Sequence, residues 1–170
     1  QSNSDRNNLK NEIEKIKSFS IENKSVELDK LKAIINFSGE YKSDSLINEC
    51  LSGNIMQYKN VLSELYSYTI NYVFMLRILS NKVQRLLNMK EMKNNNESLD
   101  SLINGCKPPI FWQDKPNVKK QLTIWNVNDL ENIKDEINIT ELMCKKNPQI
   151  SKIIFFKFFN KICKKASNFS

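Results

Sequence analysis

The stretch TINYVFMLRILSNKVQRLLNMKEM, residues 69–92, decides the fold of this chain. Its apolar residues recur at steps of three or four, which place them on one face of an α-helix, whereas a half-buried strand would need strict alternation. The face runs through Tyr72, Leu76, Leu79, Val83 and then Leu86 or Leu87. The stretch therefore predicts a long central helix with Leu76 and Leu79 in the core.

The composition favours the same class of fold. The chain has 170 residues, of which 40% are hydrophobic and 26% charged, enough to build a core for about one domain. Its three glycines are Gly39, Gly53 and Gly105. Hairpin turns that need positive φ could hardly be supplied by so few. We therefore expect an all-α protein of packed helices, with no strand.

Working outward from the central helix, periodic apolar patterns predict about eight helices in all. The further segments are residues 5–19, a helix after the capping-box-like SVEL, and residues 44–53, 54–68, 98–105, 115–125, 128–144 and 148–165. Gly53 is expected to cap the helix before it. FSGEYKSD around Gly39 is interpreted as a linker and KNNNES as a polar break. Residues expected to face inward on the helix over 128–144 are Leu130, Ile133, Ile137 and Leu142.

The usual catalytic constellations are missing from the sequence. Without histidine no Ser-His or Cys-His pair is possible, and the isolated glycines form no phosphate-binding loop. Carboxylate pairs such as Asp135-Glu136 are interpreted as solvated helix faces. We expect no enzyme activity, no catalytic residue, no cofactor and no metal.

The four cysteines and the apolar runs bear on the cellular compartment. No two cysteines form a CxxC pair, which favours reduced thiols in a cytoplasmic protein over a zinc site. Nothing resembles a signal peptide. The run IIFFKFF is too short to span a bilayer and is interrupted by Lys157. We therefore expect no membrane partner.

The formal charge of +7 is carried almost entirely by lysine, the exceptions being Arg6, Arg77 and Arg85. Nucleic-acid readers usually concentrate arginine, whose guanidinium group pairs with phosphates and base edges. Most of the lysines are therefore interpreted as a solvated face, and a DNA-facing surface is kept as the lesser alternative.

The segment PPIFWQDKPNVKKQLTIW, residues 108–125, holds three of the four prolines and both tryptophans. We call it the elbow segment. Pro108 and Pro109 prevent the preceding helix from continuing, and Pro116 suits the first turn of the next one. Leu122 and Trp125 then fall on one face with Val118 and are predicted core residues.

Phe111 and Trp112 are adjacent in the elbow segment, so both are unlikely to point into the same core. Two hypotheses remain open for them. Either both pack within the chain at a helix junction, or one of them faces a partner subunit, where aromatic residues are favoured as anchors.

From Lys107 to Trp125 the sequence resembles the pattern RPPVFFKDKPxVxRQLxxW of the delta-subunit family of the bacterial DNA polymerase III clamp loader. Lysine replaces arginine at 107 and 120, isoleucine replaces valine at 110, and Trp112 and Gln113 replace Phe and Lys. The stretches DRNNLKNEIEKI, SLINECLSGN and DLENIKDEINITELMCKKN are also similar to that family, in the same order. The resemblance covers nearly the whole chain from Asp5.

The resemblance implies a division of the chain. Residues 1–3 look like the remnant of an expression tag, and without an initiator methionine the chain is expected to begin inside a longer protein. Residues 4–42 would be the C-terminal part of a small helical AAA+ lid domain, and 43–170 a helical-bundle collar domain.

The resemblance also implies partners. The collar would bind other clamp-loader subunits, and Phe111, Trp112, Lys115 and Lys119 are expected at that interface. The sliding clamp would be bound only through a missing N-terminal domain, and DNA would be met in the assembled complex, during replication. In this family the delta subunit has no working ATP site.

Three alternatives remain open. The chain could be the collar of another AAA+ clamp-loader subunit, although the Pro-Pro-aromatic start of the elbow segment argues against it. It could be a free-standing basic helical DNA-binding module. It could also be a peripheral membrane protein using its last helix, where Lys157, Lys161 and Lys164 lie across from Phe155, Phe159 and Ile162. Against this last alternative, Ile154 and Phe158 widen the apolar face as in a packed helix.

Overall fold

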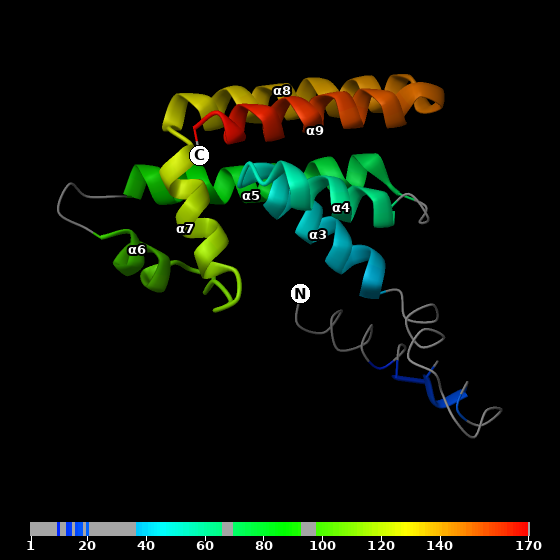
Figure 1. Cartoon of the computed structure of the whole chain (residues 1–170), viewed down its shortest axis with the longest axis horizontal. Helices are drawn as coiled ribbons and strands as arrows, with labels where there is room; N and C mark the ends of the chain where they lie inside the picture. The colour runs from blue at the N-terminus through cyan, green and yellow to red at the C-terminus, as the bar shows by residue number, and fades with distance from the viewer. Residues whose placement is uncertain are drawn as a thin grey trace. The chain divides into compact units, whose positions relative to one another are not determined.

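The computed structural model describes residues 10, 13–14, 16–18, 20, 37–65, 70–92 and 98–169, and every regular element among them is helical (Figure 1). The elements are α3 (Phe37–Leu51), α4 (Ile55–Leu65), α5 (Tyr72–Met92), α6 (Leu99–Gly105), α7 (Lys115–Ile124), α8 (Val127–Lys146), the 3-10 turn η1 (Pro148–Ile150) and α9 (Ser151–Ser167). The predicted all-α class is confirmed.

The chain forms two compact units, Gln1–Ser43 and Asp44–Ser170. The division falls next to the boundary predicted between residues 42 and 43. Of the helix predicted over 5–19, the described residues 10, 13–14 and 16–18 have helical backbone. The helix predicted after SVEL and most of the polar break KNNNES lie outside the described residues. That the first unit is an AAA+ lid and the second a collar stays a prediction.

Helix α5 is the central helix of the second unit. It contacts α7, α8 and α9, and its first turn is capped by Asn71, whose Oδ1 accepts a hydrogen bond from Phe74 N at 3.0 Å. The side chains it buries are Met75, Leu76, Leu79, Val83, Leu86, Leu87 and Met89. The prediction from residues 69–92 is thus confirmed, including both residues predicted for the core.

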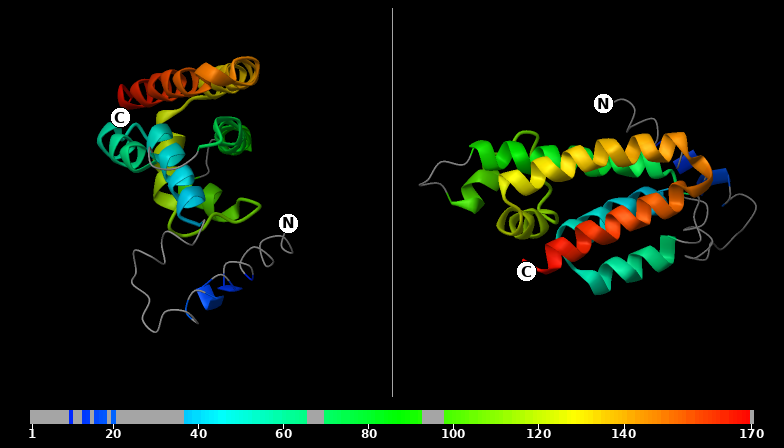
Figure 2. Two further views of the ribbon diagram at one scale, coloured as in Figure 1. Left: turned by 90° about the vertical axis from the view of Figure 1, so that its right-hand side faces the viewer. Right: turned by 90° about the horizontal axis from the view of Figure 1, so that it is seen from above.

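Helices α8 and α9 run antiparallel, side by side (Figure 2). The inward face of α9 carries an aromatic cluster, in which the rings of Phe155 and Phe159 stack with centroids 4.1 Å apart. Lys161 pairs with Glu136 at 2.7 Å across the two helices. The inward, apolar side of α9 is therefore packed into the core of the unit.

The residues predicted as a linker around Gly39 are helical instead. Helix α3 begins at Phe37 and includes the whole of FSGEYKSD, so the linker prediction was wrong. The C-terminal half of α3 is anchored by buried Leu46, Ile47, Cys50 and Leu51. Once a helix is anchored in this way, each added residue gains a hydrogen bond without a new nucleation cost, and the polar stretch carries no proline to prevent it.

The end of α3 is built on Gly53, as predicted. Gly53 has φ of +68°, a backbone conformation that L side chains rarely adopt. Its N–H donates to Cys50 O and the next residue, Asn54, donates to Glu49 O. These two bonds form a Schellman motif, which satisfies carbonyls left free by the end of the helix.

Leu142 does not face inward, contrary to the prediction for residues 128–144. Its side chain is 57% exposed, whereas Leu130, Ile133 and Ile137 are buried. The buried face continues through Thr140 and Cys144, three and seven residues after Ile137. Leu142 follows Ile137 by five residues, which at about 100° per residue turns it well away from that face.

Candidate subunit interface

The elbow segment begins in the connection between helices α6 and α7 and continues through α7. Ser98 caps α6 by accepting a hydrogen bond from Ser101 N at 3.1 Å. The helix ends at Gly105, before a cis Lys107–Pro108 bond. Helix α7 begins at Lys115 with Pro116 in its first turn, as predicted. The prolines thus separate two helices and leave the residues between them as a connecting corner.

This corner is held to the bundle at its start and is closed by a turn of its own. Ile110 is buried, with 6% of its surface exposed, and Arg85 of the central helix donates from its guanidinium group to Pro108 O. Within the corner, Asp114 N donates to Phe111 O at 2.9 Å, which closes a turn. The backbone around the two aromatic residues is therefore fixed by contacts that do not involve their side chains.

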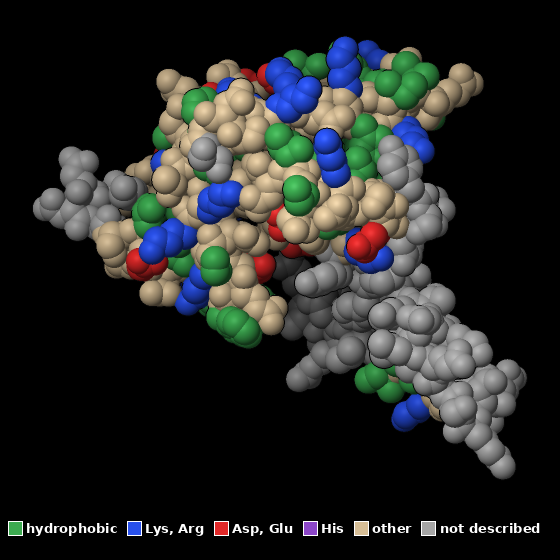
Figure 3. All heavy atoms as spheres, in the orientation of Figure 1, with side chains coloured by type: hydrophobic (Ala, Val, Ile, Leu, Met, Phe, Trp, Pro, Cys, Tyr) green, Lys and Arg blue, Asp and Glu red, His purple; other side chains and the backbone are tan. Residues whose placement is uncertain are grey.

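Phe111 and Trp112 form the exposed tip of the elbow segment. Their side chains are 79% and 74% exposed, and hydrophobic side chains project at this corner of the molecule in Figure 3. The hypothesis that both pack within the chain at a helix junction is wrong. The core makes no use of either residue, so the elbow tip offers two large apolar side chains on a fixed backbone.

The two lysines predicted beside them have partners within the chain. Lys115 Nζ donates to Asn104 Oδ1 at 2.7 Å, and Lys119 Nζ lies 2.7 Å from a carboxylate oxygen of Asp100. Both therefore tie α7 to α6. Beside the elbow tip, these two lysines hold α6 and α7 together. A neighbouring subunit could bind them only while they also keep these contacts within the chain.

The inward side of α7 docks on the turn after α3. Trp125 is fully buried and donates from Nε1 to Leu51 O at 2.8 Å, a carbonyl that the end of α3 leaves free. Gln121 Nε2 donates to Ser52 Oγ at 3.2 Å, and Lys120 Nζ donates to Asn54 Oδ1 at 2.6 Å. Together with buried Leu122, these residues fix α7 and hence the elbow.

A second exposed apolar surface lies on α8 and was missed from the sequence. Ile139, Leu142 and Met143 are 53%, 57% and 49% exposed. They stand at i, i+3 and i+4 on the side of α8 that faces away from its buried residues; we call them the α8 strip. The sequence of α8 carries apolar residues on two different faces of the helix, and the second face could have indicated this surface. It was overlooked because Leu142 was assigned to the core.

Charges border the α8 strip. Glu141 lies between Lys145, at 2.5 Å, and Arg77, at 3.4 Å. Hydrogen bonding from Lys145, together with the positive charges of Lys145 and Arg77, lowers the pKa of this carboxyl group below its ordinary value. The strip is therefore an apolar surface with an ionised, paired rim, which is the usual composition of a protein interface.

The elbow tip and the α8 strip lie on different sides of the second unit. Helix α8 runs along one side of it, the elbow segment turns at the other, and α5 lies between them, in the view of Figure 1 and in the left view of Figure 2. The two apolar surfaces are therefore separate from one another.

Two other kinds of site, a metal site and a membrane span, find no support in the part of the chain that the structure describes. Within residues 37–65, 70–92 and 98–169 no cluster of Cys, Asp and Glu side chains could hold a metal ion. Among the described helices, none has the length and apolar character needed to cross a membrane.

Comparisons of the chain with family models, curated proteins and solved structures found no match.

Proposed function

We propose that this chain is the collar and partial lid of the delta subunit of a DNA polymerase III clamp loader, and that it holds subunits of the loader together. The starting point is the resemblance of residues 107–125 to the elbow of that family. The structure adds a physical reason for the residue types in this motif, and the reason differs between its two halves.

The second half of the motif is explained by the fold. Lys120, Gln121 and Trp125 all bond to the turn after α3, so these positions set the angle at which α7 leaves the bundle.

The first half of the motif is not explained by the fold, and it carries the proposal. Phe111 and Trp112 are exposed by 79% and 74% on a corner whose backbone is held by hydrogen bonds. Exposed aromatic residues on a fixed backbone lose little conformational entropy when they are buried by a partner, and Trp is enriched among residues that dominate binding energy. An assembly surface accounts for both features.

The presence of two apolar surfaces suits a member of a ring. A subunit in a ring meets one neighbour with one surface and the other neighbour with a different one. The elbow tip and the α8 strip supply such a pair. In this proposal the chain itself has no catalytic role, acts in the cytoplasm, does not contact the sliding clamp, and meets DNA only as part of the assembled loader.

The experiment uses alanine variants of the elbow tip. Trp112→Ala should weaken binding to the other loader subunits by about 2 kcal/mol or more, as for an aromatic anchor, and should change the free energy of unfolding by no more than about 0.5 kcal/mol. Isothermal titration calorimetry against the remaining subunits and urea unfolding measure the two quantities. We expect Phe111→Ala to act in the same direction.

Met56→Ala is the matched control, because Met56 is 76% exposed on α4 and belongs to neither apolar surface. It should leave assembly unchanged. The proposal would be refuted if Trp112→Ala lowered the stability of the chain but the folded fraction of the variant still assembled normally.

A further inference from the structure

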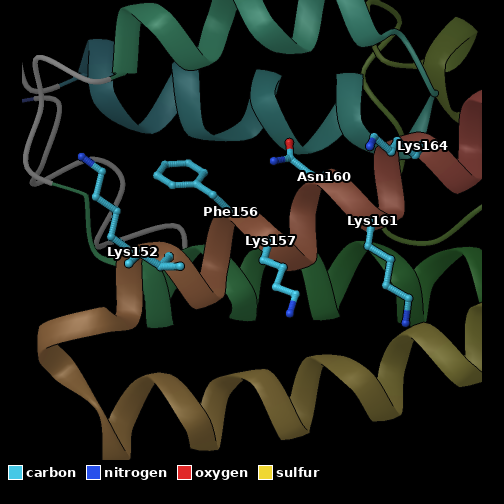
Figure 4. Close-up of a pocket in the computed structure, with 7 residues that line it drawn as sticks. Lys152, Phe156, Lys157, Asn160, Lys161 and Lys164 are labelled. Carbon is cyan, nitrogen blue, oxygen red and sulfur yellow. The ribbon is translucent and has the colours of Figure 1, made fainter.

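We propose that the outer surface of α9 is a docking groove for an acidic, amphipathic helical segment of a partner protein. The groove, of about 800 Å³, is lined by residues of α9 and is shown in Figure 4. We call it the α9 groove. Its lining includes Lys152, Ile153, Phe156, Lys157, Lys161 and Lys164.

The charged side chains among the described residues of the lining are all lysines. From Lys152 to Lys164 is twelve residues, or about 18 Å along a helix. Lys157 and Lys164 are exposed, and neither forms an ion pair with any residue that the structure describes. Lys161 is held by Glu136 at 2.7 Å. At least two lysine side chains, one before and one after Lys161 in the sequence, can therefore form ion pairs with a partner protein.

The groove also has an apolar part. Ile153 is 68% exposed, and Phe156, which is partly buried, lies beside it in the lining. An amphipathic helix presents apolar residues at steps of three and four with charged residues on either side. Carboxylates at those flanking positions would meet Lys157 and Lys164 while the apolar stripe covered Ile153.

The same observations disfavour nucleic acid as the occupant. Single-stranded nucleic acids bind where bases stack on accessible aromatic faces, usually with arginine nearby. The Phe156 ring instead packs edge-on against Tyr72 and Phe155, with centroids 6.0 and 5.2 Å away. None of the described residues that line the groove is an arginine.

A membrane and a second copy of the chain are also disfavoured. A surface-binding helix inserts its apolar face into the bilayer, but Phe155, Phe159 and Ile162 on that face of α9 are buried in the core. Two copies joined through this groove would set lysines against lysines, and like charges in an interface are unfavourable. A negatively charged protein segment remains the occupant that fits both the charge and the apolar part.

This inference does not rest on the proposed function. The α9 groove includes neither the elbow tip nor the α8 strip, so a groove that binds no acidic segment leaves the assembly proposal intact, and the reverse also holds.

The test measures binding of a designed probe to the full chain by fluorescence anisotropy. The probe is a labelled 16-residue peptide with leucine at i, i+3, i+4 and i+7 and glutamate on both flanks. A second peptide carries lysine in place of every glutamate. We expect the glutamate peptide to bind and the lysine peptide to bind at least about tenfold more weakly, because the lysine flanks repel the groove.

Variants locate the binding. The double variant Lys157→Glu and Lys164→Glu should lower the affinity for the glutamate peptide at least about tenfold, and Ile153→Ser should lower it without changing its dependence on salt. Lys107→Glu, which makes the same type of substitution at one exposed residue away from α9, should alter the affinity less than about twofold because it lies outside the groove. Far-UV circular dichroism verifies that each variant stays folded.

Several outcomes would overturn the inference. Equal binding of both peptides would do so, as would binding that the α9 variants leave unchanged. Labelled oligothymidylate or phosphatidylserine vesicles could instead bind more tightly than the glutamate peptide, with loss of that binding in the double variant. The groove would then belong to a nucleic acid or to a lipid surface.

Discussion

Replacing Trp125 by alanine should lower the free energy of unfolding by about 3–5 kcal/mol, the range for large-to-small changes at fully buried aromatic sites. Trp125 has no exposed surface and stands where α7 joins α8. Its removal leaves a cavity between them and the turn after α3, and it also leaves Leu51 O without its donor. Urea unfolding followed by circular dichroism measures the loss.

Two further variants separate the causes of this loss. Trp125→Phe keeps most of the apolar volume but removes the Nε1–H donor, so it should cost about 1–3 kcal/mol, as for a buried acceptor left unsatisfied. Trp112→Ala removes the same side chain from a site that is 74% exposed and should cost no more than about 0.5 kcal/mol. Equal losses for Trp112→Ala and Trp125→Ala would contradict the described packing of α7.

Replacing Gly53 by alanine should lower the free energy of unfolding by about 2–5 kcal/mol. One contribution is the backbone conformation, because φ of +68° costs a non-glycine residue roughly 1–2 kcal/mol. The other is steric. A β-carbon at Gly53 would lie 2.7 Å from the carbonyl carbon of Ala166 and from Ser167 N, and such overpacking costs about 1–3 kcal/mol.

The neighbours of Gly53 are backbone atoms of α9, which cannot move aside as a flexible side chain would. The substitution should therefore push the end of α9 away from the turn after α3. Gly105→Ala is the matched control, because a β-carbon there meets nothing within 4 Å. It should change stability by less than about 1 kcal/mol. A loss at Gly53→Ala no larger than that at Gly105→Ala would mean that α9 does not approach the turn as described.

Helical periodicity was enough to predict the parts of the fold that depend on one buried face. Leu76 and Leu79 on α5, and Leu122 and Trp125 at α7, are all buried, because apolar residues at regular steps have only one way to leave water together. Gly53 was predictable for a similar reason, since a glycine directly after an apolar helical pattern commonly adopts positive φ.

The errors arose where local sequence does not decide the outcome. The polar residues around Gly39 have no buried face of their own, and their helical state follows from the anchoring of the rest of α3. Leu142 is apolar but stands on the wrong side of α8, and only its distance from Ile137 along the helix distinguishes it from a core residue.

The candidate interface was predictable in position but not in detail. The prolines identify the elbow segment. Two adjacent aromatic residues in it indicate that at least one of them does not point into the core. The exposure of both Phe111 and Trp112 depends on how Ile110 and Pro108 are held by the bundle, which no local pattern encodes. In the same way, Lys115 and Lys119 find partners on α6 only because α6 and α7 pack together.

The central proposal is that this chain joins the subunits of a clamp loader without contacting the clamp itself. The most direct test is size-exclusion chromatography of the purified chain, mixed in one experiment with the other loader subunits and in another with the sliding clamp. We predict that the chain co-elutes with the loader subunits and elutes alone in the presence of the clamp. Ring interfaces spread over several helices bury more than about 1,000 Å² in total, which is enough for such a complex to survive the column. Binding to the clamp, or failure of the folded chain to join any loader subunit, would contradict the account.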